Sequence, residues 1–314
     1  KHHADKKDLI ARIDAFRRDK KQATISELDG KAAFSLSEHS RGDNASPLIY
    51  ACAYADYLSI DRDKYDVVGV TGNSMGWYIA LACGGGASDM DALKILNTTG
   101  TMMQEKLIGG QMIYGLVDEN WKPIPGRRDM LIGLTHEIDG LYVSIELGGM
   151  LVFGGTKEAL EAAEKKLKPE GRFPMRLQNH AAFHTPLLEE MSGAAQSAVN
   201  DNIFRQPSVP MIDGRGHVWM PHSTDTHLLW DYTLGHQMRR TYDFTRAVQV
   251  SVKEFAPDCV IILGPGSTLG GAVAQSLIGI GWQGWRSKED FANRQKENPY
   301  ILSMGMDEQR KLVA

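Results

Sequence analysis

The chain has 314 residues, which is enough for one large domain or two of ordinary size. Its composition, 42% hydrophobic and 24% charged, is that of a globular protein with a sizeable core, and it excludes disordered, collagen-like and disulfide-scaffold classes. The 35 basic and 39 acidic residues leave a net charge of −4, which argues against nucleic acid as a main partner, and no apolar run approaches the roughly 18 residues of a membrane-spanning helix.

The cysteines and the first residues bear on the compartment. Cys52, Cys83 and Cys259 are odd in number, widely spaced and without a CxxC pair, so they fit buried thiols in a reducing compartment better than disulfide bridges. Lys1 and the residues after it lack the apolar core of a signal peptide. These observations predict a cytoplasmic protein of enzyme size.

Several elements are predicted in the first third of the chain from the spacing of apolar residues. Residues 5–30 have helical spacing, and residues 48–58 are expected to form a largely buried helix. Residues 65–71, a continuous β-branched run, are typical of a strand buried on both faces of a parallel sheet. A sharp turn then leads into a helix that runs to about Cys83, and another helix is expected from Asp89 to Leu107.

From about Gly109 the pattern changes to short strand-like segments separated by turn residues. Strands followed by one amphipathic helix predict a small α+β unit inserted into a larger α/β domain. The helices and the strand expected after Pro186 return to the α/β pattern. The strand-like segments are Gln111–Leu116, Met130–Leu134, Leu141–Leu147 and Met150–Phe153, and the helix is Lys157–Leu167.

The strongest local motif is Gly72-Asn73-Ser74-Met75-Gly76, a G-x-S-x-G sequence between a predicted strand and a predicted helix. A strand-to-helix turn this tight crowds the backbone, so a Cβ at either glycine is expected to clash. The turn exposes the Ser74 hydroxyl, and it places the Met75 amide at a helix N-terminus, where it is suited to stabilising an oxyanion. The string alone is weak evidence, but its place between strand and helix predicts a nucleophilic serine.

A serine nucleophile needs a general base, and His184 is the candidate because it lies where a loop becomes a helix. His180 stands four residues before it, which is also the spacing of a zinc-binding pair. In zinc hydrolases a general-base glutamate follows the first histidine of such a pair, whereas Ala181 follows His180 here. We therefore predict no metal site.

A glycine-rich turn, Gly264-Pro265-Gly266, follows a predicted strand and opens a helix. It does not match the dinucleotide fingerprint, because Leu269 stands where the third glycine belongs, and it lacks the Gly-Lys-Ser/Thr of a P-loop. The turn is therefore expected to wall a ligand site at the carboxyl edge of the sheet without holding phosphate.

Taken in order, these motifs resemble one family. The turn around Ser74, the Met103-Gln104 pair in the following helices, the Ala182–Leu187 segment around His184 and the Gly264 turn are similar in order and spacing to two related groups of enzymes. These are the malonyl-CoA:acyl-carrier-protein transacylases and the acyltransferase domains of polyketide synthases. The resemblance covers nearly the whole chain.

The resemblance implies an α/β fold with two subdomains. A parallel-sheet, hydrolase-like large subdomain with a nucleophile elbow, residues 1–109 and 179–314, would hold a small ferredoxin-like α+β subdomain, residues 110–178. The resemblance also implies a ping-pong reaction without a bound cofactor. Ser74, activated by His184, would take an acyl group from acyl-CoA and pass it to the phosphopantetheine thiol of an acyl carrier protein. No nucleic acid or membrane partner is expected.

Departures from the family pattern bear on the acyl group. Members that take malonyl-type groups carry an arginine at the position of Thr99, and a threonine cannot neutralise a buried carboxylate. Either another arginine, such as Arg172 or Arg176, reaches the pocket, or the acyl group is neutral, for example acetyl. The candidate pocket residues are Thr99, Trp77 in place of a family glutamate, Asn73 in place of a family histidine, and Phe183, which agrees with selection of small, unbranched acyl groups.

Two further expectations follow from the resemblance. Asp243 stands where the family has a glutamine or arginine near the histidine, and it is expected either to orient His184 or to begin a helix as a solvated carboxylate. The family also begins with a strand that ends in a glutamine-containing oxyanion turn, and no such sequence precedes Lys1. We expect that segment in the native protein, because its absence would leave neighbouring strands unpaired.

The leading functional hypothesis is an acyltransferase of fatty-acid or polyketide synthesis that moves malonyl, or a neutral acyl group such as acetyl, from CoA to acyl carrier protein. An acyl-carrier-protein or acyl-CoA thioesterase would use the same site and would differ only in admitting water to the acyl-enzyme. A catalytically silent subunit that binds carrier protein is the third alternative, and intact Ser74 and His184 argue against it.

Overall fold

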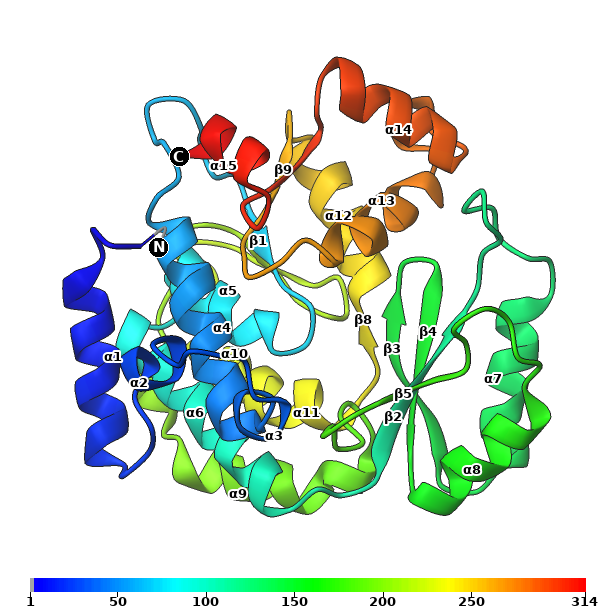
Figure 1. Cartoon of the computed structure of the whole chain (residues 1–314), viewed down its shortest axis with the longest axis horizontal. Helices are drawn as coiled ribbons and strands as arrows, with labels where there is room; N and C mark the ends of the chain where they lie inside the picture. The colour runs from blue at the N-terminus through cyan, green and yellow to red at the C-terminus, as the bar shows by residue number, and fades with distance from the viewer. Residues whose placement is uncertain (1–2) are drawn as a thin grey trace.

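A computed structural model describes residues 3–314, and helices make up most of the first hundred residues (Figure 1). The helix expected over residues 5–30 is divided in two, because Thr24 accepts a hydrogen bond from the Glu27 amide and starts a second helix with a capping box. The helix expected over residues 48–58 begins earlier, at Gly42. These helices are α1 (Lys7–Asp19), α2 (Ile25–Asp29), α3 (Leu36–His39), α4 (Gly42–Tyr57), α5 (Gly76–Gly84) and α6 (Asp89–Glu105).

The middle of the chain forms a mostly antiparallel sheet with two helices. The strand order β5-β2-β4-β3 and the chain order β-α-β-β-α-β are the ferredoxin-like arrangement. The subdomain boundaries themselves, residues 1–109, 110–178 and 179–314, remain a prediction. The elements are β2 (Gly110–Gly115), α7 (Arg127–Glu137), β3 (Leu141–Leu147), β4 (Met150–Gly155), α8 (Lys157–Lys166) and β5 (Met175–Leu177).

One predicted strand is wrong, because Met130–Leu134 lies inside α7. Leu131 and Leu134 are buried three residues apart, whereas Met130 is exposed. Such a spacing fits a helix that packs one face on a neighbouring strand. Within a segment of only five residues, however, periodicity does not distinguish a helix from a strand.

The two faces of this sheet belong to two different cores. Phe153 of β4 packs in a small core with Leu131 of α7 and Leu160 of α8. Val152, its neighbour along the strand, points to the opposite face and joins the large core together with Ile113 of β2. This alternation is the period of two that a strand imposes, and it fixes the small sheet onto the rest of the molecule.

The strands of the larger part are short and do not form one continuous sheet. The expected strand over residues 65–71 is only partly formed, because strand geometry is confined to β1 and Val68 is 43% exposed rather than buried. β1 pairs with β6 in parallel, β7 is antiparallel to β6, and β9 pairs with β10 in parallel. The strands are β1 (Val70–Thr71), β6 (Met211–Ile212), β7 (Val218–Trp219), β9 (Val260–Ile262) and β10 (Ile301–Ser303).

Helices after Pro186 pack around these strands. One continuous helical segment changes type along its length: α10 (Thr226–Asp231) passes through a π turn, η3 (Tyr232–His236), into α11 (Gln237–Arg239). β8 (Tyr242–Asp243) then pairs in parallel with β3 and joins the larger part to the small sheet. The other helices are η1 (Pro186–Leu188), α9 (Glu189–Ala198), η2 (Asp201–Ile203), α12 (Phe244–Phe255), α13 (Leu269–Ile278), η4 (Trp282–Gly284), α14 (Lys288–Glu297) and α15 (Asp307–Val313).

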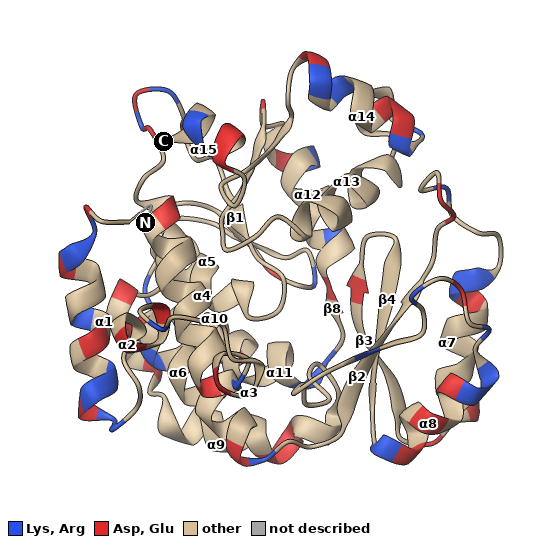
Figure 2. Cartoon of the chain, in the orientation of Figure 1, with Lys and Arg blue, Asp and Glu red and all other residues tan. Residues whose placement is uncertain are grey.

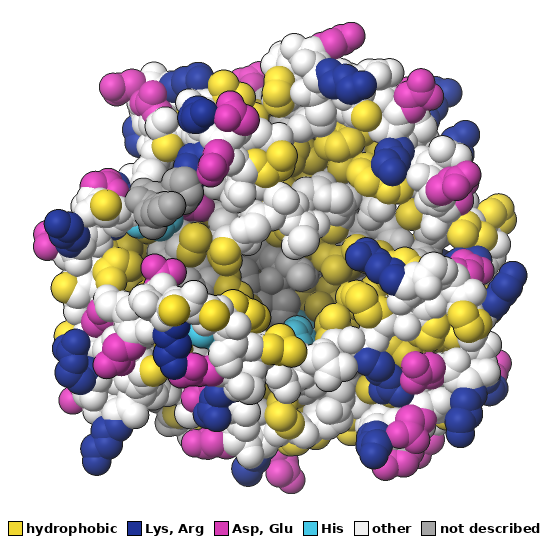
Figure 3. Space-filling view, in the orientation of Figure 1, with side chains coloured by type: hydrophobic (Ala, Val, Ile, Leu, Met, Phe, Trp, Pro, Cys, Tyr) yellow, Lys and Arg dark blue, Asp and Glu magenta, His cyan; other side chains and the backbone are white. Residues whose placement is uncertain are grey.

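Lys or Arg and Asp or Glu residues alternate along the helices at the outside of the view, among them α1, α7, α8 and α14 (Figure 2). The face in Figure 3 is hollowed near its centre, with hydrophobic side chains around the opening. No helix among residues 3–314 is both long enough and apolar enough to cross a membrane.

Candidate active site

The G-x-S-x-G motif forms a sharp turn between β1 and α5. Ser74 has a φ of +53°, a left-handed conformation that is costly for a residue with a side chain and that clusters at functional sites. A Cβ built on Gly72 would lie 2.1 Å from the Gly76 carbonyl oxygen, so only glycine fits there. The clash expected at Gly76 itself is wrong, because no atom lies within 4 Å of a Cβ at that position.

Ser74 and His184 are brought together from distant parts of the chain. The Ser74 Oγ lies 2.7 Å from the His184 Nε2. His184 is 1% exposed and has a φ of +58°, so both members of the pair hold strained backbone. The segment that carries His184 is attached to the small sheet, because the Ser144 hydroxyl of β3 donates to the Phe183 carbonyl.

Two backbone carbonyls at the end of α11 hold the other side of His184. The Gln237 carbonyl oxygen lies 2.5 Å from Nδ1, and the Met238 carbonyl accepts from the His184 amide at 2.9 Å. A carbonyl can only accept, so Nδ1 carries the ring proton and Nε2 is left to accept a proton from Ser74. The last carbonyls of a helix carry partial negative charge, which stabilises the imidazolium that forms when this proton is taken.

Burial lowers the pKa of His184 to about 4, so the imidazole is neutral at neutral pH. We expect the rate at which Ser74 reacts with a fluorophosphonate to be constant from about pH 8 to about pH 5 and to fall below that, because the neutral ring is the base. A histidine with an ordinary pKa of about 6.5 would instead give about a tenfold loss by about pH 5.5. Labelling rates across this range, with circular dichroism to verify folding at each pH, distinguish the two profiles.

Asp243 does not make the hydrogen bond to His184 that was one of its two predicted roles. Its carboxylate accepts from the Arg246 amide at 2.7 Å and caps the N-terminus of α12, which is the other role. The Nδ1 atom of His184 is already occupied by the Gln237 carbonyl. A backbone group therefore stands where the sequence suggested a carboxylate.

The Met75 amide is available to an anion. The amides of the next three residues donate back to the carbonyls of residues 73–75, whereas the Met75 amide has no hydrogen-bond partner within residues 3–314. It lies beside Ser74 at the start of α5, where backbone N–H groups are unsatisfied and the helix dipole favours negative charge. This is the donor that an oxyanion on an acyl group attached to Ser74 would need.

Three of the candidate pocket residues have distinct surroundings. Trp77 is completely buried, and its indole N–H donates to the Thr233 hydroxyl at 3.0 Å, so it holds the π turn against α5. Phe183 is half-buried with its ring centroid 6.0 Å from that of His184. The Oδ1 atom of Asn73 is buried without a hydrogen-bond partner within residues 3–314.

Thr99 offers no charge and only one hydroxyl, which is already used. It is 5% exposed, and its Oγ1 lies 3.1 Å from two carbonyls one turn earlier in α6. The two arginines named as substitutes are engaged by groups of the small sheet and its helices. Arg176 is bonded to Glu164 on α8, and the Arg172 guanidinium lies 5.2 Å from the ring centroid of Phe173.

Sequence reasoning missed the side chains that connect the elbow to the segment after the π turn. The Tyr78 hydroxyl donates to Gln237 Oε1, and Gln237 Nε2 donates to the Ser74 carbonyl. The Tyr242 hydroxyl donates to the Gly72 carbonyl, and its ring centroid lies 5.3 Å from that of His184. No motif points to these contacts, because tyrosine and glutamine are ordinary core residues and half of the partners are backbone atoms.

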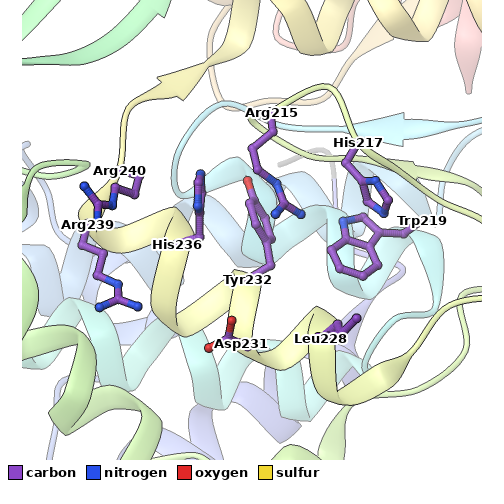
Figure 4. A pocket seen from close by; sticks show the side chains of 9 residues that line it. All are labelled: Arg215, His217, Trp219, Leu228, Asp231, Tyr232, His236, Arg239 and Arg240. Carbon is purple, nitrogen blue, oxygen red and sulfur yellow. The ribbon is translucent and has the colours of Figure 1, made fainter.

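A separate pocket of about 430 Å³ lies beside the π turn and was also not anticipated (Figure 4). Tyr232 and His236 stand side by side, with ring centroids 5.7 Å apart, and the Arg215 guanidinium lies 4.3 Å from the Tyr232 centroid. The positive charge here is largely matched, because Arg215 forms a salt bridge with Asp213 and Arg239 forms one with an acidic neighbour.

One group of metal-ligating side chains falls within the described residues. His3, Cys52 and Asp56 each offer one atom, and these atoms lie within 4.8 Å of one another. The Asp56 carboxylate, however, accepts from the Gly264 amide at 2.7 Å and pairs with Arg310. The group therefore fits an ion-pair junction that holds the turn after β9.

Comparison with known proteins finds distant sequence relatives among polyketide synthases and malonyl-CoA:acyl-carrier-protein transacylases. No family model matches the chain. A highly reducing polyketide synthase from Eupenicillium brefeldianum is 25% identical over 260 residues, which cover 77% of this chain and 10% of that protein. The malonyl CoA-acyl carrier protein transacylase of Salmonella typhimurium is 25% identical over 214 residues, which cover 64% of this chain and 63% of that protein.

Solved structures with a similar fold include malonyl-CoA:acyl-carrier-protein transacylases. The malonyl-CoA:acyl carrier protein transacylase of Helicobacter pylori matches with a TM-score of 0.73 at 20% identity, covering 99% of this chain and 89% of that one. In sequence the chain is similar to polyketide synthases and to a malonyl-CoA:acyl-carrier-protein transacylase, and in fold it is similar to solved structures of such transacylases. Its fold is the α/β fold of these solved transacylases, and the chain spans 10% and 15% of the length of the first two polyketide synthases that it matches.

Proposed function

We propose that the chain is an acyl-CoA:acyl-carrier-protein S-acyltransferase of fatty-acid or polyketide synthesis that works through an ester on Ser74. The observation that carries this proposal is the 2.7 Å contact between Ser74 Oγ and His184 Nε2 at a strained turn of a transacylase-type fold. The backbone carbonyl on Nδ1 fixes the tautomer of the base without a third side chain. The proposed location is the cytoplasm, a reducing compartment that suits free thiols at Cys52, Cys83 and Cys259.

The proposed reaction has two halves that use the same proton carrier. In the first, His184 Nε2 takes the Ser74 proton as Oγ attacks the thioester carbonyl carbon of acyl-CoA, and the Met75 amide donates to the developing oxyanion. The C–S bond then breaks, and CoA leaves as a thiol with the proton that His184 returns. In the second, the phosphopantetheine thiol of an acyl carrier protein gives its proton to His184 and attacks the ester. Ser74 regains its proton as the new thioester forms.

We propose a neutral acyl group as the substrate, because the position of the family arginine supplies no cation. The Thr99 hydroxyl is bonded within α6, and a neutral hydrogen bond is worth only about 1 kcal/mol net. Desolvating a malonyl carboxylate costs several times more, and a guanidinium would offset that cost with two parallel charge-assisted bonds. Acetyl or another short neutral acyl group needs only an apolar wall, which Phe183 beside His184 would supply.

Acetyl-CoA is therefore expected to acylate Ser74 at least as fast as malonyl-CoA, and Thr99→Arg is expected to raise the malonyl-to-acetyl ratio by about tenfold or more. Intact-protein mass spectrometry after brief incubation with a panel of acyl-CoAs measures both rates. Thr98→Arg is the matched control, because it adds the same charge about 100° away around the same helix.

The same spectra separate the alternative functions. Clear malonyl preference in the unchanged chain would contradict the proposed substrate class and leave acyl transfer standing. An acyl group that leaves Ser74 in water, with no carrier protein added, would assign hydrolysis instead. If no acyl-CoA shifted the mass, the chain would be better described as a silent subunit that binds carrier protein.

A further inference from the structure

Gln237 touches both members of the candidate catalytic pair. Its backbone oxygen accepts from His184 Nδ1 at 2.5 Å, and its side-chain Nε2 donates to the Ser74 carbonyl at 3.1 Å. The remaining amide oxygen accepts from the Tyr78 hydroxyl at 3.1 Å, so the amide group is bonded at both ends. Gln237 is 3% exposed, so its amide group makes its hydrogen bonds to protein groups and not to solvent.

The place of Gln237 depends on the π turn that precedes it. A π turn inserts an extra residue into a helix and rotates everything that follows, and such turns are frequent at functional sites. Two consecutive residues of α5 bind the segment at positions four apart, since Trp77 donates to Thr233 and Tyr78 donates to Gln237. The helix that carries Ser74 at its start therefore also sets the position of the helix end that holds His184.

We propose that the Gln237 side chain is a positioning residue, which fixes the separation between Ser74 Oγ and His184 Nε2 by binding the Ser74 carbonyl to the helix end that holds the imidazole. The contacts form a closed circuit: Ser74 Oγ to His184 Nε2, His184 Nδ1 to the Gln237 carbonyl, and Gln237 Nε2 back to the Ser74 carbonyl. A closed circuit of three hydrogen bonds allows none of its members to move alone.

Losing the side-chain bond would open this circuit at one point. Ser74 itself would then be linked to this helix end only through its hydrogen bond to His184, which must break and re-form during each proposed turnover. A displacement of about 1 Å between reacting groups can cost about 100-fold in rate. The backbone carbonyl that orients His184 would remain, so the expected effect is on the rate of the step and not on the binding of substrate.

This inference rests on the proposed function, so its test uses a reaction that needs no acyl donor. A fluorophosphonate labels an activated serine directly, and its saturation kinetics separate the maximal labelling rate from the concentration that gives half of it. Gln237→Leu is expected to lower the maximal rate by about 10- to 100-fold and to leave the half-saturating concentration unchanged. Trp230→Phe is the matched control, because it removes another hydrogen bond of the same helical segment, from the indole N–H to the Val199 carbonyl, that involves neither α5, Ser74 nor His184.

A second variant gives a readout that a purely structural role would not move. In Gln237→Glu the ionised carboxylate cannot donate to the Ser74 carbonyl, whereas the protonated acid can donate there and still accept from Tyr78. Burial raises the pKa of a glutamate, and the pKa of His184 is about 4, so the base stays neutral while the acid protonates. The surrounding phenols, Tyr78 and Tyr242, have raised pKa values and remain neutral. The variant-to-wild-type rate ratio is therefore expected to rise as the pH falls from about 8 to about 5.5.

Each outcome of these measurements either supports or overturns the positioning role of Gln237. A slow Gln237→Leu, a near-normal Trp230→Phe and a rate ratio for Gln237→Glu that rises toward low pH would support the positioning role. Equal labelling of Gln237→Leu and the unchanged chain, or equal losses in Gln237→Leu and Trp230→Phe, would overturn it and leave the proposed function intact. An unchanged chain whose Ser74 does not react at all would overturn the proposed function and this inference with it.

Discussion

Ser74→Ala and His184→Ala are each expected to lower acyl transfer by about 10⁴-fold or more, and the double variant is expected to lose no more than either single one. The reason is the 2.7 Å contact between Oγ and Nε2, because a base without its nucleophile has no proton to take and a nucleophile without its base stays a neutral hydroxyl. The measurement is the initial rate of thioester formation on the phosphopantetheine thiol of an acyl carrier protein.

A histidine of the same segment serves as the control for this experiment. His180 is bonded to Gln111 of β2 and not to Ser74, so His180→Ala is expected to keep most of the activity. Losses that multiply in the double variant would mean that Ser74 and His184 act independently. That result would remove the assignment of the pair as one catalytic unit.

Gly72→Ala is expected to destabilise the fold by more than about 4 kcal/mol, which is near the total stability of many domains. The added methyl group would lie 2.1 Å from the Gly76 carbonyl oxygen and 2.2 Å from its carbon, and both are backbone atoms that cannot turn aside. The expected result is a large fall in the midpoint of chemical denaturation or a failure to accumulate folded protein.

The second glycine of the motif provides the comparison. A Cβ at Gly76 meets nothing within 4 Å, and the residue lies in α5, so Gly76→Ala is expected to be neutral or to stabilise by up to about 1 kcal/mol. Denaturant unfolding of the two variants side by side tests the geometry of the turn without any assay of activity. Comparable stability of the two alanine variants would contradict the crowding described at Gly72.

Local patterns in the sequence predicted the pairing of Ser74 with His184 better than the groups that hold the two residues in place. The crowded turn before Ser74 needs glycine at position 72, so the residue type there reveals the geometry. The group that orients His184 is the Gln237 carbonyl, and every residue has a carbonyl, so no residue type marks it. Of the two roles predicted for Asp243, the structure shows the second, because its carboxylate caps the N-terminus of α12.

The same limit applies to the fold. The apolar residues of Met130–Leu134 are compatible with a strand and with a buried helix. The segment forms part of α7, which packs against β3, and this packing cannot be read from the local sequence. The π turn at Tyr232–His236 accepts a hydrogen bond from Trp77 of α5, which lies 156 residues earlier in the chain. Interactions over such a separation are set by tertiary structure and leave little trace in local periodicity.

The left-handed backbone at Ser74 and His184, with φ of +53° and +58°, has a consequence for engineering. Each such residue holds about 1–3 kcal/mol that the rest of the fold must supply, and glycine at either position would release it. The strain at the two residues that the proposed chemistry needs therefore lowers the free energy of unfolding of the molecule. A library of variants selected only for survival on heating is biased toward relaxing this turn, so reactivity has to be scored beside melting temperature from the first round.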